Sequence, residues 1–258
     1  MGLTKEEVIL KATHTTMIIP MSIITLMPTK NEIKISPDIA RLRLWQLISP
    51  ALPVGAYAYS TGLENAVDCG WISDEKASSD WITGQLQHNL SALDVPVMKR
   101  LYQAWQKNEV AHAEHWSRFL LASRESGELL AEDRHLGSAL ARLLPELGIE
   151  QARNWQDTNH NSFAAMFSLA AAHWQVPVAE AAQGYLWAWC ENQVAAAIKL
   201  IPLGQTAGQR ILSTVTQQIP TAVNHGLQLE DEDIGAIAPG VALASARHET
   251  QYSRMFRS

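Results

Sequence analysis

The sequence predicts an all-α protein, folded as a single-domain bundle of roughly nine to ten helices. From Ser36 onward, apolar residues recur every three or four positions, which is the spacing of a helix with one buried face. Alternating β-branched runs, typical of strands, are scarce, and prolines and glycines divide the chain at helix-length intervals. Neither a low-complexity linker nor a repeat of fixed period separates two halves, so one domain is preferred.

The first helix is predicted to begin at Ser36-Pro37, an N-cap hydroxyl followed by proline at the first helical position. Its apolar stripe consists of Ile39, Leu42, Trp45 and Ile48. The segment SPALPVG (49–55) must end this helix, because two prolines and a glycine cannot continue it. A second helix is expected over 61–67, ending near Gly70.

The rest of the chain follows the same periodicity. Helices are predicted over 74–92, 96–107, 110–125, 128–144, 158–174, 178–199, 205–218 and 232–246. Six tryptophans fall on helical faces, where this side chain usually anchors a core: Trp81, Trp105, Trp116, Trp174, Trp187 and Trp189.

Residues 1–35 precede the helical pattern and are expected to be an extension, either disordered or lying before the natural start. The apolar run MIIPMSIITLM (17–27) is too short to span a bilayer, is interrupted by Pro20 and lacks a signal-peptide cleavage pattern. The domain proper is therefore expected to cover 36–258, with a docking tail at 247–258, and no membrane contact is predicted.

Charge and cysteine content restrict the class of protein. The formal net charge is −6 and the isoelectric point about 5.8, with cations scattered along the chain, so nucleic acid is not an expected partner. Cys69 and Cys190 lie far apart in predicted helices and are expected to be buried free thiols. This usage fits a reducing cytoplasm.

Catalytic signatures are missing from the sequence, which contains no nucleophile elbow, Walker A loop, dinucleotide fingerprint or C-x-x-C pair. HETQY (248–252) begins like a zinc-protease motif but has Tyr252 where the second histidine must stand. His112 and His115, one helical turn apart beside acidic residues, leave open a metal site in a helical enzyme or a direct metal carrier. We predict no catalytic residue, no cofactor and no bound metal.

Two acidic segments have simple structural interpretations. LEDEDIG (229–235) lacks a calcium-loop pattern and is interpreted as a solvated helix start. RESGELLAEDR (124–134) alternates in sign at helical spacing, which favours exposed ion pairs of small energy over a partner surface.

Three segments suggest contact with another protein. Tyr57 and Tyr59 follow the Pro/Gly turn, which either presents them at an interface or is a plain core turn. In KLIPLGQTAGQR (199–210), a tight helix corner explains the glycines but not Gln205 and Gln209, which lie one turn apart.

The third segment is the C-terminus, RHETQYSRMFRS (247–258). It is rich in the residue types of interface hot spots, namely Arg247, Tyr252, Arg254, Phe256 and Arg257. A tail that docks on its own domain is the alternative to the preferred exposed end that binds another chain. We expect removal of 248–258, or Arg254→Ala, to weaken partner binding without unfolding the domain.

The motifs LISPALPVGAYAYSTGLENAVDCGWI, IPLGQTAGQR and ASARHETQYSRMFRS, in this order, resemble the UreF family of urease accessory proteins from about Arg41 to Ser258. The resemblance implies an all-α, dimeric, non-enzymatic chaperone. In that family the chaperone joins UreD (UreH in some species) and the GTPase UreG on apo-urease and helps to place nickel.

The resemblance also assigns roles to individual positions. Tyr57 matches the aromatic residue after the P-V-G turn, Lys199 the basic residue linked to control of the GTPase, and Arg254 the arginine of the terminal R-L-F-x-S motif, associated with complex formation. This chain departs from the pattern at Ala56, Gly127 and Met255, and residues 1–35 have no counterpart. The predicted partner-binding residues are therefore Tyr57, Tyr59, Lys199, Gln205, Gln209, Tyr252, Arg254, Phe256 and Arg257.

Overall fold

The structure is a computed structural model that describes residues 10–12, 15–17 and 35–258. The chain divides into two units, Met1–Ile35 and Ser36–Ser258. In the first unit, β1 (Leu10–Ala12) and β2 (Thr15–Met17) pair as a short antiparallel ladder. Most of 1–35 and of the apolar run at 17–27 lies outside the described residues, so the expectation for this extension stays a prediction.

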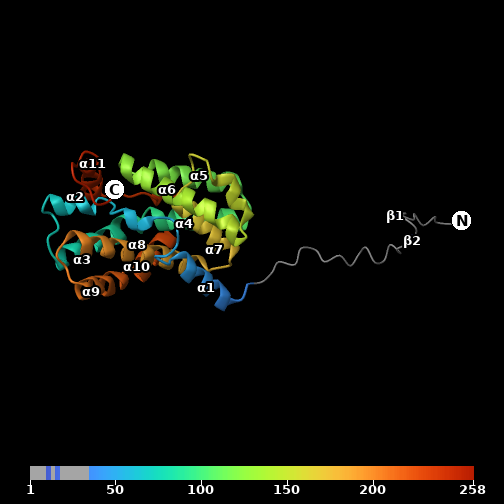
Figure 1. Ribbon diagram of the computed structural model, residues 1–258, viewed down its shortest axis with the longest axis horizontal. Coiled ribbons are helices and arrows are strands. Elements are labelled where there is room, and N and C mark those ends of the chain that lie inside the picture. The colour runs from blue at the N-terminus through green and yellow to red at the C-terminus, as the bar shows by residue number, and fades with distance from the viewer. Residues whose placement is uncertain (1–9, 13–14, 18–34) are drawn as a thin grey trace. The chain divides into compact units, whose positions relative to one another are not determined.

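The second unit, Ser36–Ser258, is helical, which confirms the predicted all-α fold (Figure 1). Short 3₁₀ turns and one π-helical turn, η3 (Leu86–Leu90), connect the longer elements. The α-helices in this described part are α1 (Pro37–Leu47), α2 (Leu63–Asp68), α3 (Glu75–Gln85), α4 (Asp94–Gln106), α5 (Val110–Ala122), α6 (Gly127–Leu143), α7 (Phe163–His173), α8 (Val178–Leu200), α9 (Gln205–Thr216), α10 (Ile219–Gln228) and α11 (Pro239–His248).

Four helices begin at side-chain caps that the sequence encodes directly. Ser36, Asp74, Ser126 and Ser162 each have extended backbone and accept a hydrogen bond from the amide three residues on. Each cap satisfies an amide that would otherwise lack a partner and contributes about 1 kcal/mol. Local sequence therefore fixes these boundaries well.

The core is built around α4 and α8, which lie in the middle of the bundle in Figure 1. α4 packs against α5, α7 and α10, whereas α8 packs against α2, α9 and α10. The approach of α10 is close: a Cβ atom added at Gly226 would lie 2.4 Å from the carbonyl oxygen of Ser91. Among the described helices, none combines the length and apolar character that a membrane-spanning helix requires.

Two predicted helices are interrupted, and one helix was not predicted. The segment 74–92 changes to π-helical winding at Leu86, and 232–246 resolves into η6 (Asp231–Asp233) followed by α11. α10 escaped prediction, although Pro220 stands in its first turn, where proline loses no helical hydrogen bond.

The predicted stripe of the first helix faces outward instead of into the core. Ile39, Leu42 and Trp45 are 48%, 51% and 58% exposed, whereas Ala40, Leu44 and Leu47 are buried. Of the six tryptophans expected in the core, Trp105 and Trp174 are buried and the other four are half-buried. The thiol prediction holds for Cys190, which is buried, and is wrong for Cys69, which is exposed.

Candidate functional site

The Pro/Gly turn separates the two predicted tyrosines. Gly55 adopts a left-handed conformation (φ +82°), which starts the short turn η2 (Ala56–Ala58). Tyr57 is 70% exposed, but Tyr59 is only 4% exposed and its hydroxyl lies 3.0 Å from Nδ1 of His135. Asn192 also donates to the carbonyl oxygen of Tyr59 at 3.0 Å. Only Tyr57 therefore presents its ring outward, as an interface residue requires.

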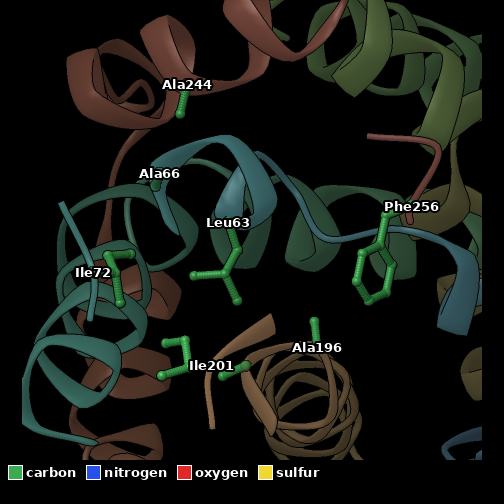
Figure 2. Packing of buried hydrophobic residues seen from close by; sticks show 8 residues of the cluster. Leu63, Ala66, Ile72, Ala196, Ile201, Ala244 and Phe256 are labelled. Atoms are coloured by element: carbon green, nitrogen blue, oxygen red, sulfur yellow. The ribbon is translucent and has the colours of Figure 1, made fainter. Parts of the chain in front are cut away.

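The C-terminal tail packs on its own domain, in contrast to the exposed end expected from the sequence. Phe256 is 6% exposed and joins the apolar cluster of α2, α8 and α11, where it lies near Leu63 and Ala196 (Figure 2). The buried chain end continues beside the Pro/Gly turn, because the amide of Ser60 donates to the Ser258 carbonyl oxygen at 2.8 Å. The amide of Arg257 donates to the carbonyl oxygen of Ala58 at the same distance.

A buried carboxylate, Glu64 of α2, holds this tail. Its two oxygens accept the backbone amides of Met255 at 2.6 Å and Phe256 at 2.8 Å. His248 lies between two carboxylates, with Nε2 3.1 Å from Glu64 and Nδ1 2.7 Å from Glu128. An ionised carboxylate only accepts hydrogen bonds, so both ring nitrogens donate when both acids are ionised.

The outer side of the tail carries the predicted cation. Arg254 donates to Glu128 at 2.9 Å and remains exposed, as do Tyr252 and Met255. The tail therefore has an inner side that fixes it to the domain and an outer side available to other molecules.

Lys199 lies in the same region as the tail. At the end of α8 its ammonium group stands 5.4 Å from the ring centroid of Phe256, within cation–π range. The three segments that the sequence singled out therefore come together in part. The tail contacts Lys199 through the Phe256 ring and the Pro/Gly turn through its backbone.

Gln205 and Gln209 are exposed on the first turns of α9, and neither side chain makes a hydrogen bond within the described residues. Of the two glycines in this segment, Gly208 is tightly packed, because an added Cβ would lie 2.2 Å from Cδ1 of Ile198. Gly204 faces open space, so the tight helix corner accounts for one glycine and not the other.

The histidines of the alternative metal site lie on a solvated surface. His112 is paired with Glu109 at 3.0 Å, and His115 packs edge-on against Trp116 at a centroid distance of 5.3 Å. In the part of the chain that the structure describes, no three His, Cys, Asp or Glu side chains gather in an arrangement suited to a metal ion. The histidine of HETQY, His248, is buried in the tail network described above.

Sequence reasoning missed a buried ionic cluster in the segment 124–134, whose ion pairs were expected at the surface. Arg124 lies 2.8 Å from Asp94 and 2.7 Å from Asp133, and both aspartates are buried. Burial opposes the charged guanidinium, but the two aspartates together raise the pKa of Arg124 well above its ordinary value. The Tyr185 hydroxyl donates to Asp94 at 3.0 Å, which ties α8 to the cluster.

This cluster borders a partly open cavity of about 230 Å³ that the Pro/Gly turn also lines. Glu132 lines the cavity and accepts hydrogen bonds from Ser258 at 2.7 Å and Thr61 at 3.4 Å. Burial raises the pKa of Glu132 to about 7, although both hydroxyls lower it. The alternating charges of 124–134 were the available sequence signal for the ionic cluster. The burial of this cluster depends on contacts with α4 and α8, which are remote in sequence.

Comparison with known proteins gives a consistent result. A model of the UreF family matches residues 72–216, more than half of the chain. The urease accessory protein UreF of Alkalilimnicola ehrlichii is 53% identical over 223 residues, which cover 86% of this chain and 98% of that protein. The UreF proteins of Hahella chejuensis and Teredinibacter turnerae are 48% and 47% identical, over 86% and 84% of this chain and 100% and 98% of their own lengths. The chain belongs to the UreF family of urease accessory proteins.

Proposed function

We propose that this protein is a non-enzymatic adaptor of urease maturation in the cytoplasm. It joins a UreD-type (UreH) protein and a UreG-type GTPase on apo-urease, and so supports GTP-dependent placement of nickel. The observation that supports this most is the convergence of Tyr57, Lys199 and the tail, because these are the positions to which the family resemblance assigns partner contacts.

Co-purification tests the adaptor directly. The chain, mixed with UreD-type and UreG-type proteins of the same urease system, should yield one complex containing all three. Omitting this chain should leave the other two unjoined and apo-urease inactive after addition of nickel and GTP. Equilibrium dialysis with nickel or zinc distinguishes the adaptor from the alternative, a metal-dependent enzyme or metal carrier. Such a protein should bind the metal tightly and lose it on His112→Ala.

The outer side of the tail is the proposed UreD-type contact. Arg254→Ala removes an exposed cation whose only described partner is Glu128, so the fold should survive while affinity falls roughly thirtyfold, a typical hot-spot effect. Deleting 248–258 would not test the outer side of the tail alone, because it also removes buried His248 and Phe256. Tyr252→Ala is the second variant, since that side chain is fully exposed.

Lys199 is the proposed contact for control of the GTPase. Lys199→Ala should change GTP hydrolysis by the UreG-type protein within the assembled complex. Because the ammonium group also packs over Phe256, Lys199→Arg, which keeps a cation, is the matched control. A lower melting temperature with unchanged turnover would contradict the regulatory role.

The outward face of α1 supports a homodimer. Trp45 and the half-buried Trp187 line a surface groove of about 830 Å³ between α1, α8 and α10, beside the exposed Leu42. An apolar patch of this kind on a protein surface is typical of an interface. Leu42→Asp should therefore shift the chain to a monomer in light scattering, whereas Ile237→Asp, at a still more exposed site in the segment before α11, should not.

A further inference from the structure

A second groove, separate from the dimer patch, opens beside the Pro/Gly turn. It has a volume of about 540 Å³ and lies between η2, the second half of α6, the connection before α7, and the end of the tail. Tyr57, His135, Arg142 and Arg257 line it together with Asp157 and Thr158. We call it the arginine groove.

The arginine groove carries two cations that the domain does not use. Arg142 and Arg257 are exposed, and neither side chain forms an ion pair or hydrogen bond within residues 35–258. Asp157 is the one acidic residue of the lining, so two cations and one anion leave a local charge of +1 with His135 neutral. The whole chain carries −6, so the groove is a positive site on an acidic protein.

The lining of the groove favours a polypeptide over a free anion. An exposed ion pair alone contributes little, because water screens it, and a small anion held only by two surface arginines would bind weakly. Tyr57 adds an exposed ring, and Val54 and Ala139 add apolar lining, which an isolated anion would not bury. The forked guanidinium groups fit carboxylates in pairs, as acidic side chains along a peptide supply them.

We propose that the arginine groove binds a carboxylate-rich segment of a partner protein. Arg142 and Arg257 pair with its acidic side chains, and Tyr57 packs against an apolar residue between them. Arg257 is held in place by its backbone bond to Ala58 and by the burial of Phe256, so this site is complete only while the tail is docked. The proposal rests on the adaptor function and names the chemistry of one of its contacts.

Charge reversal in the groove tests the proposal. Arg142→Glu and Arg257→Glu should each lower the affinity for one of the two partners, the UreD-type or the UreG-type protein, by roughly tenfold or more in calorimetry. Arg134→Glu is the control, because Arg134 is also exposed on α6 and lies outside the described lining. The wild-type affinity for that partner should fall with added salt, and the salt dependence should be smaller in the groove variants.

The outcomes separate this proposal from the adaptor function. If both partners bind the groove variants as tightly as the wild type, the arginine groove is not a docking site, although the adaptor function stands. If the variants change the oligomeric state and leave both partners bound, the occupant is a second copy and the proposal is overturned. Wild-type protein that binds neither partner would overturn the adaptor function and this site with it.

Discussion

Glu64→Gln is the most direct test of how the tail is held. This buried carboxylate of α2 accepts the amides of Met255 and Phe256 and also faces Nε2 of His248. Glutamine has nearly the same shape but replaces one accepting oxygen with an NH₂ group, which donates. One backbone amide of the tail must then face a donor, and the charge opposite His248 disappears.

The size of the effect follows from these contacts. A hydrogen bond to a charged group contributes about 1.5 to 3 kcal/mol, and leaving a buried donor without an acceptor costs about 1 to 3 kcal/mol. Because glutamine keeps one acceptor, we expect a loss of about 2 to 4 kcal/mol in the free energy that keeps the tail docked.

Native-state hydrogen exchange at the Met255 and Phe256 amides measures this quantity. Protection should fall by roughly 30-fold to 1,000-fold in the variant, since about 1.4 kcal/mol corresponds to a factor of ten. Glu249→Gln is the matched control: Glu249 is an exposed residue that accepts only the Gly127 amide among described residues, so protection at Met255 should persist. Equal protection in wild type and Glu64→Gln would refute the role given to this carboxylate.

Three further results are expected. In the native protein one thiol should react with a water-soluble thiol reagent and two after denaturation, because Cys69 is exposed whereas burial raises the pKa of Cys190 to about 12. Glu132 has a folded pKa of about 7 against an ordinary 4.5, so the native state holds a proton that the unfolded chain has released. Its contribution to stability is therefore present below pH 4.5 and falls by roughly 3 kcal/mol as the pH rises to about 7. The free energy of unfolding in urea should therefore depend less on pH across this window in Glu132→Gln than in the wild type. Gly226→Ala should lower the free energy of unfolding by about 3 kcal/mol or more, because the new Cβ would lie 2.4 Å from the Ser91 carbonyl oxygen; a melting temperature equal to wild type would contradict this packing.

Local signals in the sequence predicted most of the helical fold. The predictions that failed have a common cause, which is that local patterns carry no tertiary information. Caps such as Ser36 and Asp74 act within three residues, so they can be identified without tertiary information. Periodicity on α1 identified an apolar stripe at Leu42 and Trp45, but it cannot tell whether the same chain covers that stripe. In this structure the stripe stays exposed, and Ala40, Leu44 and Leu47 of α1 pack inward.

The candidate site was predictable in composition and not in arrangement. Tyrosine, phenylalanine and arginine are the residue types of both interfaces and buried anchors, so the sequence could not distinguish exposed Tyr57 from buried Tyr59. The decisive contacts join positions far apart, such as Ser60 and Ser258, which no local pattern encodes. The ionic cluster around Arg124 was misplaced at the surface for the same reason.

The two sides of the tail restrict how a partner can bind it. Phe256 and Ser258 face the domain, whereas Tyr252, Arg254 and Met255 face solvent. A partner that pulled the tail away would have to replace the Glu64 hydrogen bonds and the buried ring, which together cost several kcal/mol. A partner that binds the outer side keeps those contacts and also keeps Arg257 in the arginine groove. Docking on the intact tail is therefore the less costly route, and it makes stability of the tail a condition for recognition at both places.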